Sequence, residues 1–432
     1  MFKIIVELSC ISALIYALNI LLLRLILLKQ HYELKKSGYK KNLTKTHPGK
    51  DVINIGLFTN ELAPWVVYGG VATWIDAFIS MFNKNKRLNI IPIFLAFNDS
   101  LPDEAYEKYS NLRIINSIDD INNVFSDIDV CVNNLWISLD TVITIKNIFP
   151  TMPIISVCHS LIRMEHITNM GSQYTENFND QEKLFQNSDY IVLISNAEKE
   201  YYDQFGYNKF DAKTVVIYNS YTPKYDTGAY EVDYNNDNLG YIGRHVPRKR
   251  PELPLKAVEY LQNEIIKVVN MGVDYDKYDN AYWRKLEKEY KDNLVVIPFS
   301  TDKNIKTNFF KSIGIISIPG IYEPFGYTIC EALDRGFPAI VQNIDGPKEI
   351  IEGFEEYVYT YEVDKDNYEQ DIINFSKTLE KVLITSPETR KLNASNARRA
   401  LDRFRPEVIS KDWNNLFEKI LEKNNLINLI LD

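Results

Sequence analysis

Two carboxylates eight residues apart flank a turn in the segment 319–338. The Pro-Phe-Gly sequence after Glu323 predicts a turn between a buried strand and a helix. The first N–H groups of such a helix lack intrahelical partners, so the backbone of residues 326–328 can bind an anion. Glu323 before the helix and Glu331 on its second turn can accept hydrogen bonds from sugar hydroxyls, as carboxylates do from a ribose diol. A capped amphipathic helix with Glu331 in solvent is the plain alternative.

Four cations lie within seven residues, directly after another predicted strand. They are Arg244, Arg248, Lys249 and Arg250. Cations at the carboxyl end of a strand suit a diphosphate, and they would stabilise a leaving nucleoside diphosphate as its charge develops. A solvated basic turn is the alternative interpretation.

Two further candidates follow predicted strands in the first half of the chain. Gly69 and Gly70 let the backbone approach a ligand closely at the start of a helix. This turn is not a GxGxxG fingerprint, so a nicotinamide cofactor lacks its usual signature. His159 ends another strand and can hydrogen-bond a sugar hydroxyl, although a lone histidine is more often structural. No HxxxH spacing occurs, and we predict no metal site.

Short apolar runs alternate with helical patterns from about residue 51 onward, which predicts α/β architecture with parallel sheets. In the first half, strands are expected at 52–58, 90–97, 128–132, 154–157, 190–194 and 214–218, with a helix over 71–82. In the second half, strands are expected at 239–242, 266–269, 294–297, 315–318 and 339–341. The helices expected there are 252–263, 279–292, 302–311 and 327–335.

A polar, turn-rich segment over 221–237 predicts a linker between two domains. We expect one doubly wound, Rossmann-like domain over 51–220, a second over 238–405 and a helical tail over 406–432. Two such domains create a cleft that binds its ligand at the carboxyl ends of the strands.

The overall composition is that of a globular protein. Of the 432 residues, 45% are hydrophobic and 25% are charged, and the net charge of −9 argues against a dedicated nucleic-acid binder. The four cysteines are scattered without a CxxC pair. They favour a reducing compartment and argue against a zinc site or a disulfide framework.

The first 50 residues differ from the rest, because nine basic and two acidic side chains give them a net charge of +7. The uncharged apolar run over 8–23 predicts an N-terminal membrane anchor within 1–28, followed by a basic juxtamembrane segment over 29–50. A cleaved signal peptide and a buried helix are the alternatives. The positive-inside rule predicts a single-pass anchor with both domains facing the cytosol.

In this order, the segments resemble the retaining GT-B glycosyltransferases, the family 4-like group that includes glycogen synthases and many nucleotide-sugar α-mannosyl- and glucosyltransferases. The resemblance is carried by Gly243-Arg244 with Lys249, then Glu323-Pro-Phe-Gly-Tyr-Thr-Ile-Cys-Glu331, Gly336-Phe-Pro338 and Gly346-Pro-Lys-Glu349. Two positions depart from the family pattern. Arg250 replaces the glycine usual after the lysine, and Asp345 stands where the first glycine of a Gly-Gly-x-x-Glu block is common.

The resemblance implies a role for each candidate residue in binding a nucleoside-diphosphate sugar. Glu323 would hold the donor sugar at its 3- and 4-hydroxyls, and Glu331 would chelate the donor ribose. Arg244 and Lys249 would grip the diphosphate, and His159 would touch the sugar. The phosphate cradle would be completed by backbone amides of Gly70, Phe325, Gly326, Tyr327 and Thr328.

The resemblance also implies transfer of a hexose-type sugar to a hydroxyl acceptor with retention, by same-face attack and without a protein nucleophile, metal or further cofactor. The predicted anchor favours a glycan or glycolipid acceptor at a membrane. A sugar-nucleotide epimerase on the same fold and an inactive sugar-binding descendant are the alternatives. The joint presence of Arg244, Lys249, Glu323 and Glu331 argues against the inactive one.

Overall fold

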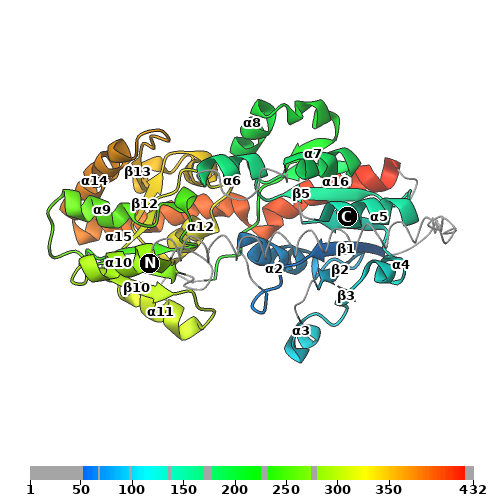
Figure 1. Ribbon diagram of the computed structural model, residues 1–432, viewed down its shortest axis with the longest axis horizontal. Coiled ribbons are helices and arrows are strands. Elements are labelled where there is room, and N and C mark those ends of the chain that lie inside the picture. Colours follow the sequence, from blue (N-terminus) through cyan, green and yellow to red (C-terminus); the bar gives the residue numbers. More distant parts are fainter. Residues whose placement is uncertain are drawn as a thin grey trace, which may run out of the picture.

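The computed structural model describes residues 52–66, 69–96, 100–134, 138–169, 178–224, 232–273 and 280–423. These residues form two α/β domains that lie side by side (Figure 1). The predicted anchor over 1–28 and the basic segment over 29–50 lie outside the described residues. Within the described ranges, no helix combines the length and hydropathy needed to cross a membrane.

The first domain is built on a seven-stranded parallel sheet with the order β3-β2-β1-β4-β5-β6-β7. Its strands are rich in Val and Ile, as expected where helices cover both faces of a sheet. They are β1 (Ile53–Thr59), β2 (Leu88–Leu95), β3 (Arg113–Ile115), β4 (Val130–Asn133), β5 (Ile154–Cys158), β6 (Tyr190–Leu193) and β7 (Thr214–Val216). The helices between them are α2 (Gly70–Phe82), α3 (Asp103–Lys108), η1 (Ile118–Asp120), α4 (Ile121–Val124), α5 (Leu139–Ile148), α6 (Ile162–Thr168), α7 (Phe178–Asn187), α8 (Asn196–Gln204) and η4 (Tyr207–Lys213).

The second domain holds a six-stranded parallel sheet with the order β10-β9-β8-β11-β12-β13. Its strands are β8 (Leu239–Ile242), β9 (Val268–Val273), β10 (Leu294–Pro298), β11 (Ile315–Ile318), β12 (Ala339–Gln342) and β13 (Tyr359–Tyr361). Its helices are η5 (Pro247–Lys249), α9 (Leu253–Tyr260), α10 (Asn280–Glu289), α11 (Lys303–Lys311), α12 (Tyr327–Arg335), α13 (Asp345–Ile351), η6 (Glu355–Tyr357), α14 (Tyr368–Ile384) and α15 (Pro387–Ala397). The predicted alternation and the parallel sheets are therefore confirmed.

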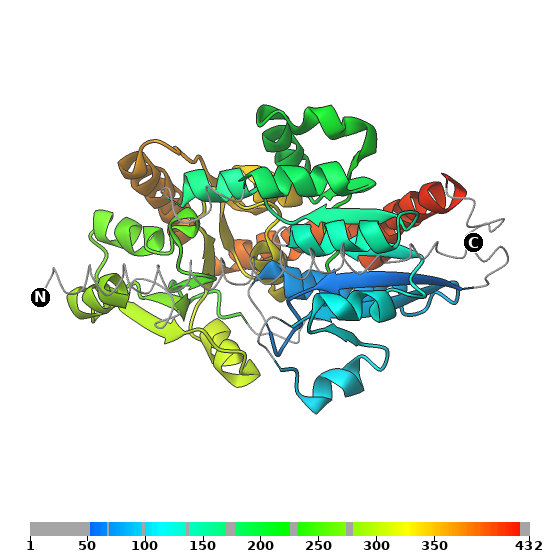
Figure 2. The same ribbon diagram turned by 45° about the vertical axis from the view of Figure 1, so that its right-hand side comes forward.

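The chain then returns to the first domain through η7 (Arg398–Phe404) and α16 (Pro406–Lys423). Figure 2 shows α16, in red, running back along the first domain. Its Trp413 ring meets the Phe78 ring of α2 edge-on, with centroids 4.9 Å apart. Phe417 meets Phe82 of α2 in the same way at 5.9 Å. The C-terminal helix therefore completes the core of the domain that begins the described chain.

The strand order reverses beside the first strand of each sheet. β1 lies between β2 and β4, and β8 lies between β9 and β11. Doubly wound folds bind ligands at the carboxyl ends of the strands at this switch point. The loop after β1 carries the Gly-Gly turn, the loop after β8 carries the cations, and the loop after β11 carries Glu323. The topology thus directs the candidate segments to the two switch points.

Candidate functional site

Lys249 and Glu323 meet where the loops after β8 and β11 run side by side. The Lys249 ammonium forms an ion pair with Glu323 Oε2, and both side chains are about a fifth exposed, at 19% and 18%. The two loops are also joined by their backbones, because the Ile321 N–H donates to the Arg248 carbonyl at 2.8 Å. The structure therefore brings together a cation and a carboxylate that are 74 residues apart in the chain.

The Gly-Gly turn of the first domain lies against this part of the second domain. A Cβ on Gly69 would lie 3.9 Å from a terminal nitrogen of Arg244, and one on Gly70 would lie 3.3 Å from the Tyr327 ring. A larger residue at position 70 would crowd Tyr327. The exposed Arg244 and the starts of α2 and α12 thus share one region at the domain boundary.

The helix α12 begins with a glycine in a left-handed conformation. Gly326 is its N-cap, with a φ of 113°, which only glycine adopts without strain. No side chain caps this end of the helix. The N–H groups of Tyr327 and Thr328 lie in the first turn, where no intrahelical acceptor exists. Positive helix-dipole potential and unsatisfied donors therefore coincide at the switch point.

The Phe325 side chain lies in the hydrophobic core. It is 2% exposed and packs edge-on against the rings of Tyr327 at 5.3 Å and Phe404 at 5.4 Å. Its backbone is in close contact with Gly346, where a Cβ would lie 2.4 Å from the Phe325 Cα. Phe325 therefore anchors the turn, and any contact with a ligand falls to the backbone.

Glu331 points from α12 toward α11. Its carboxylate accepts from Lys306 at 2.8 Å and from Arg335 at 3.1 Å. Burial disfavours its ionised form, but these two cations outweigh burial and lower the pKa of Glu331. The group is therefore an ionised acceptor at neutral pH, held separately from the Lys249–Glu323 pair.

His159 lies at the end of β5 beside α2. Its Nε2 is 3.0 Å from Asn134 Oδ1, and its ring meets the Trp74 ring edge-on at 5.1 Å. Burial lowers the pKa of His159 to about 3, so the ring is neutral at physiological pH. It can hydrogen-bond a hydroxyl without adding charge to the site.

Two of the four clustered cations form ion pairs with carboxylates of other helices. Arg248 pairs with Glu165 of α6 at 3.2 Å, and Arg250 pairs with Asp371 of α14. Arg248 and Arg250 are 4% and 7% exposed. The expectation that the whole cluster binds phosphate therefore does not hold for these two, because their side chains are almost completely buried against residues of α6 and α14.

The two departures from the family pattern both occupy left-handed backbone positions. Arg250 has a φ of 44° and Asp345 a φ of 54°, a conformation in which glycine is unstrained. Arg250 gains the ion pair with Asp371 and lies over the Tyr368 ring at 5.2 Å. Asp345 accepts the Glu323 N–H at 3.2 Å and the Tyr201 hydroxyl at 2.6 Å. Side-chain contacts therefore compensate for the strain at both positions.

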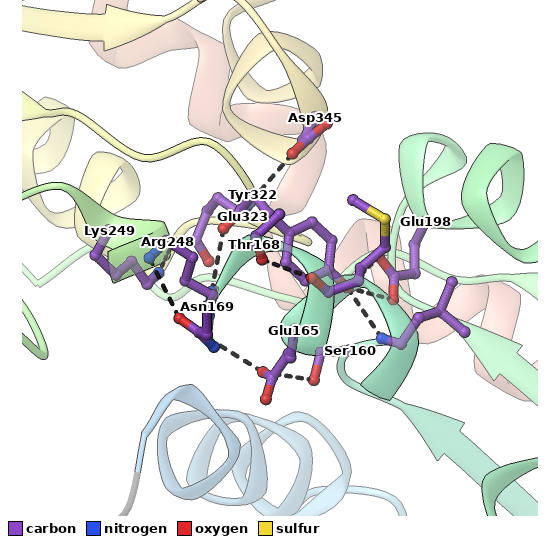
Figure 3. A network of polar contacts seen from close by, with 12 residues as sticks. Ser160, Glu165, Thr168, Asn169, Glu198, Arg248, Lys249, Tyr322, Glu323 and Asp345 are labelled. Carbon is purple, nitrogen blue, oxygen red and sulfur yellow. Dashed lines mark hydrogen bonds and ion pairs between the residues drawn. The ribbon is translucent and has the colours of Figure 1, made fainter. Parts of the chain in front are cut away.

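A polar network between the domains lies beside the Lys249–Glu323 pair (Figure 3). Tyr322 donates to Glu198 of α8, and Arg248 pairs with Glu165 of α6. Sequence reasoning missed Glu165, Glu198 and Tyr322, because their partners are 83 and 124 residues away and no local pattern marks them. In the described part of the chain, no group of three or more His, Cys, Asp or Glu side chains is arranged to hold a metal ion.

Comparisons with known proteins find a family match in the second domain. Residues 230–397 match the family model described as glycosyl transferases group 1. The chain is 26% identical over 191 residues to an uncharacterised glycosyltransferase of Methanocaldococcus jannaschii, which covers 41% of this chain and 48% of that protein. The chain spans about half the length of the curated relatives it matches.

Solved structures share the fold at low sequence identity. A sucrose-phosphate synthase from Thermosynechococcus elongatus superposes with a TM-score of 0.68 and 16% identity, over 86% of this chain and 100% of that one. The Anabaena protein HepE, solved with UDP and glucose, gives a TM-score of 0.64 and 16% identity, over 85% and 99% of the two chains. The two facing Rossmann-like domains are therefore a GT-B fold. The fold is thus shared over most of the chain, and the similarity to the group 1 glycosyltransferase model lies in residues 230–397 of the second domain.

Proposed function

We propose that this chain transfers a hexose-type sugar from a nucleoside-diphosphate sugar to a hydroxyl acceptor, with retention of the anomeric configuration. The observation that carries the proposal is the meeting of Lys249 and Glu323 beside the start of α12, at the switch point of the second sheet. A cation, a carboxylate and a helix N-terminus at one strand edge suit a sugar diphosphate. The UDP and glucose in the HepE complex support a nucleotide-sugar donor.

The diphosphate would be bound by cations and by backbone N–H groups. Arg244 and Lys249 would contact its oxygens, while the first-turn amides of α12 donate to the same group. The backbone at Gly70, which lies against Tyr327, would complete the cradle from the first domain. These donors would stabilise the negative charge that develops on the leaving phosphate.

The carboxylates would bind the hydroxyls of the donor. Glu323 pairs with Lys249 in the structure, and a phosphate that takes over Lys249 would release this carboxylate for the sugar. Glu331, ionised between Lys306 and Arg335, would accept from the ribose diol. The neutral His159 would hydrogen-bond the sugar.

Transfer would occur on one face of the sugar. The bond from C1 to the phosphate oxygen breaks, the acceptor oxygen bonds to C1 from the same side, and the acceptor proton passes to the leaving phosphate. No side chain forms a covalent intermediate, in contrast to retaining glycosidases with two carboxylates. Metal independence is part of the proposal, so activity should survive EDTA.

A panel of UDP-, ADP- and GDP-linked sugars, assayed by nucleotide release and product analysis, tests the proposal. We expect one donor to yield a product of retained configuration. Glu323→Ala and Lys249→Ala should each lower kcat about a hundredfold or more. The control is Lys256→Ala, because Lys256 pairs with Glu259 on the surface of α9.

The other outcomes of this panel discriminate between the alternatives. Near-normal rates in both variants would contradict the assigned roles. Release of an epimer or of free sugar without an acceptor would favour an epimerase. An intact protein that turns over no donor would favour a sugar-binding descendant.

We further propose a glycan or glycolipid acceptor at the cytosolic face of a membrane, reached through an anchor within residues 1–28. This rests on the apolar run and on the basic residues that follow it. Deletion of residues 1–50 should reduce transfer to acceptors in membranes and leave transfer to a soluble acceptor analogue unchanged. Equal rates on membranes for both forms would contradict this part of the proposal.

A further inference from the structure

Residues of the first domain bind Arg248 and Tyr322, which directly precede Lys249 and Glu323 in the chain. Arg248, directly before Lys249, pairs with Glu165 at 3.2 Å, and its backbone N–H donates to Asn169 Oδ1 at 3.2 Å. Glu165 is ionised because the cations Arg248 and Arg244 outweigh its burial and lower its pKa. The loop after β8 is therefore tied to α6.

Tyr322, directly before Glu323, is held in the same way. Its hydroxyl donates to Glu198 of α8 at 2.9 Å and accepts the Leu161 N–H at 2.9 Å, and the residue is fully buried. The Tyr322 carbonyl accepts from the Arg248 guanidinium at 3.1 Å, and this bond joins the loop after β11 to the loop after β8. Figure 3 shows these contacts as one connected network.

The helix α8 makes two further contacts with α13 of the second domain. Glu349 of α13 accepts the N–H groups of Asn196 at 3.1 Å and Ala197 at 2.6 Å, so a carboxylate of the second domain caps the helix. Tyr201 donates to Asp345, which in turn accepts the Glu323 N–H. The helix α8 is therefore bound to α13, and Asp345 of α13 connects it to the loop that carries Glu323.

We propose that Glu198 and Tyr322 are positioning residues for the transfer reaction, which fix Glu323 relative to Lys249 through a contact between the two domains. The inference rests on the proposed function for its kinetic consequence. A buried carboxyl group is costly unless it is hydrogen-bonded. The Tyr322 hydroxyl hydrogen-bonds the Glu198 carboxyl group across the domain boundary, and Tyr322 is the residue next to Glu323 in the chain. Displacements of about 1 Å at a reacting centre cost rate about a hundredfold, so this hydroxyl controls kcat.

The kinetic test removes the contact and then restores it. Tyr322→Phe and Glu198→Ala should each lower kcat about tenfold or more, with the dissociation constant of the nucleoside diphosphate changed less than about twofold. Glu198→Gln should recover most of the rate, because burial raises the pKa of Glu198 to about 8 and glutamine matches its neutral form. The matched control is Tyr202→Phe, which removes a buried hydroxyl from α8 that contacts Thr214 within the first domain.

The outcomes separate positioning from stability. The inference is wrong if Tyr322→Phe keeps the wild-type kcat, or if its decrease in kcat is no larger than that of Tyr202→Phe. Loss of nucleotide binding in step with kcat would also overturn it. If Glu198→Ala does not fold, Tyr322→Phe, which removes one oxygen only, still decides the question.

Amide hydrogen exchange provides a readout that needs no turnover. In Tyr322→Phe, peptides covering 246–250 and 319–326 should exchange about tenfold faster, because the Ile321 and Glu323 N–H groups are bonded within this network. Tyr202→Phe should leave these peptides unchanged. If the wild-type protein transfers no sugar, the proposed function fails while the exchange result still decides whether Tyr322 holds the loop. Unchanged exchange in Tyr322→Phe would overturn the inference.

Discussion

Arg250 and Asp345 have strained backbone conformations, and side-chain contacts of the same residues offset this strain. Arg250 illustrates this, because its left-handed backbone favours glycine while its guanidinium neutralises Asp371, which has no exposed surface. Strain at such a position costs about 1–3 kcal/mol, and an unpaired buried carboxylate costs about 3–5 kcal/mol. The ion pair is therefore the larger effect.

Arg250→Gly should accordingly destabilise the protein by roughly 2–3 kcal/mol, even though it introduces the residue that suits the backbone. Urea unfolding of the isolated variant measures this difference. The double variant Arg250→Gly with Asp371→Asn should recover most of the loss, since the amide no longer needs a cation. An Arg250→Gly variant as stable as wild type would show that the strain outweighs the pair.

The residue scale is also where sequence reasoning was least complete. The motif around Glu323 and Lys249 marked a pair that the structure brings together. The buried positions of Arg248 and Arg250 were not evident, because a run of basic residues carries no sign of which members face a carboxylate. Contacts such as Tyr322 to Glu198 depend on the fold of both domains and have no local signature.

At the level of elements, periodicity and capping residues predicted most boundaries. The helix α12 was expected at 327–335 and runs over those residues, because Gly326 and Gly336 both take left-handed conformations at its ends. The edge strands β3 and β13 were missed, since each has three residues and no apolar run. β9 extends past its predicted end to Val273, through Gly272, where a Cβ would lie 2.3 Å from the Gly243 carbonyl oxygen.

The capping of α8 by Glu349 gives a prediction at the same scale. Glu349→Gln removes the charge that faces two helix N–H groups and the Tyr218 hydroxyl. We expect a loss of about 1 kcal/mol in unfolding free energy. Glu352→Gln is the matched control, because its side chain is 71% exposed and pairs with Arg403 at the surface. Equal stability of the two variants would contradict a capping role.

The whole molecule is organised by the return of the chain to its first domain. Asp334 of α12 accepts from the Tyr221 hydroxyl at 3.1 Å, the Lys224 N–H at 2.7 Å and Arg398 at 2.9 Å. The segment that leaves the first domain and the segment that returns to it therefore both contact α12, the helix that carries Glu331. The predicted tail was helical without a known partner. The apolar face of α16 packs against α2, a contact that the sequence of the tail alone does not indicate.

This connection predicts that the last helix stabilises the first domain. Trp413→Ala should lower the unfolding free energy by about 3–5 kcal/mol, because the ring is 1% exposed among Trp74 and Phe78. Leu392→Ala, at a residue 61% exposed on α15, should change it by less than about 0.5 kcal/mol. Urea unfolding followed by tryptophan fluorescence compares the two. A small effect of Trp413→Ala would show that α16 is dispensable to the core.

A crystal structure of the protein with the nucleoside diphosphate of its best donor tests the central claim most directly. The account predicts the diphosphate within hydrogen-bond distance of Arg244, Lys249 and the first N–H groups of α12, with Glu323 released from Lys249. A diphosphate bound away from these groups, with the Lys249–Glu323 pair intact, would contradict it.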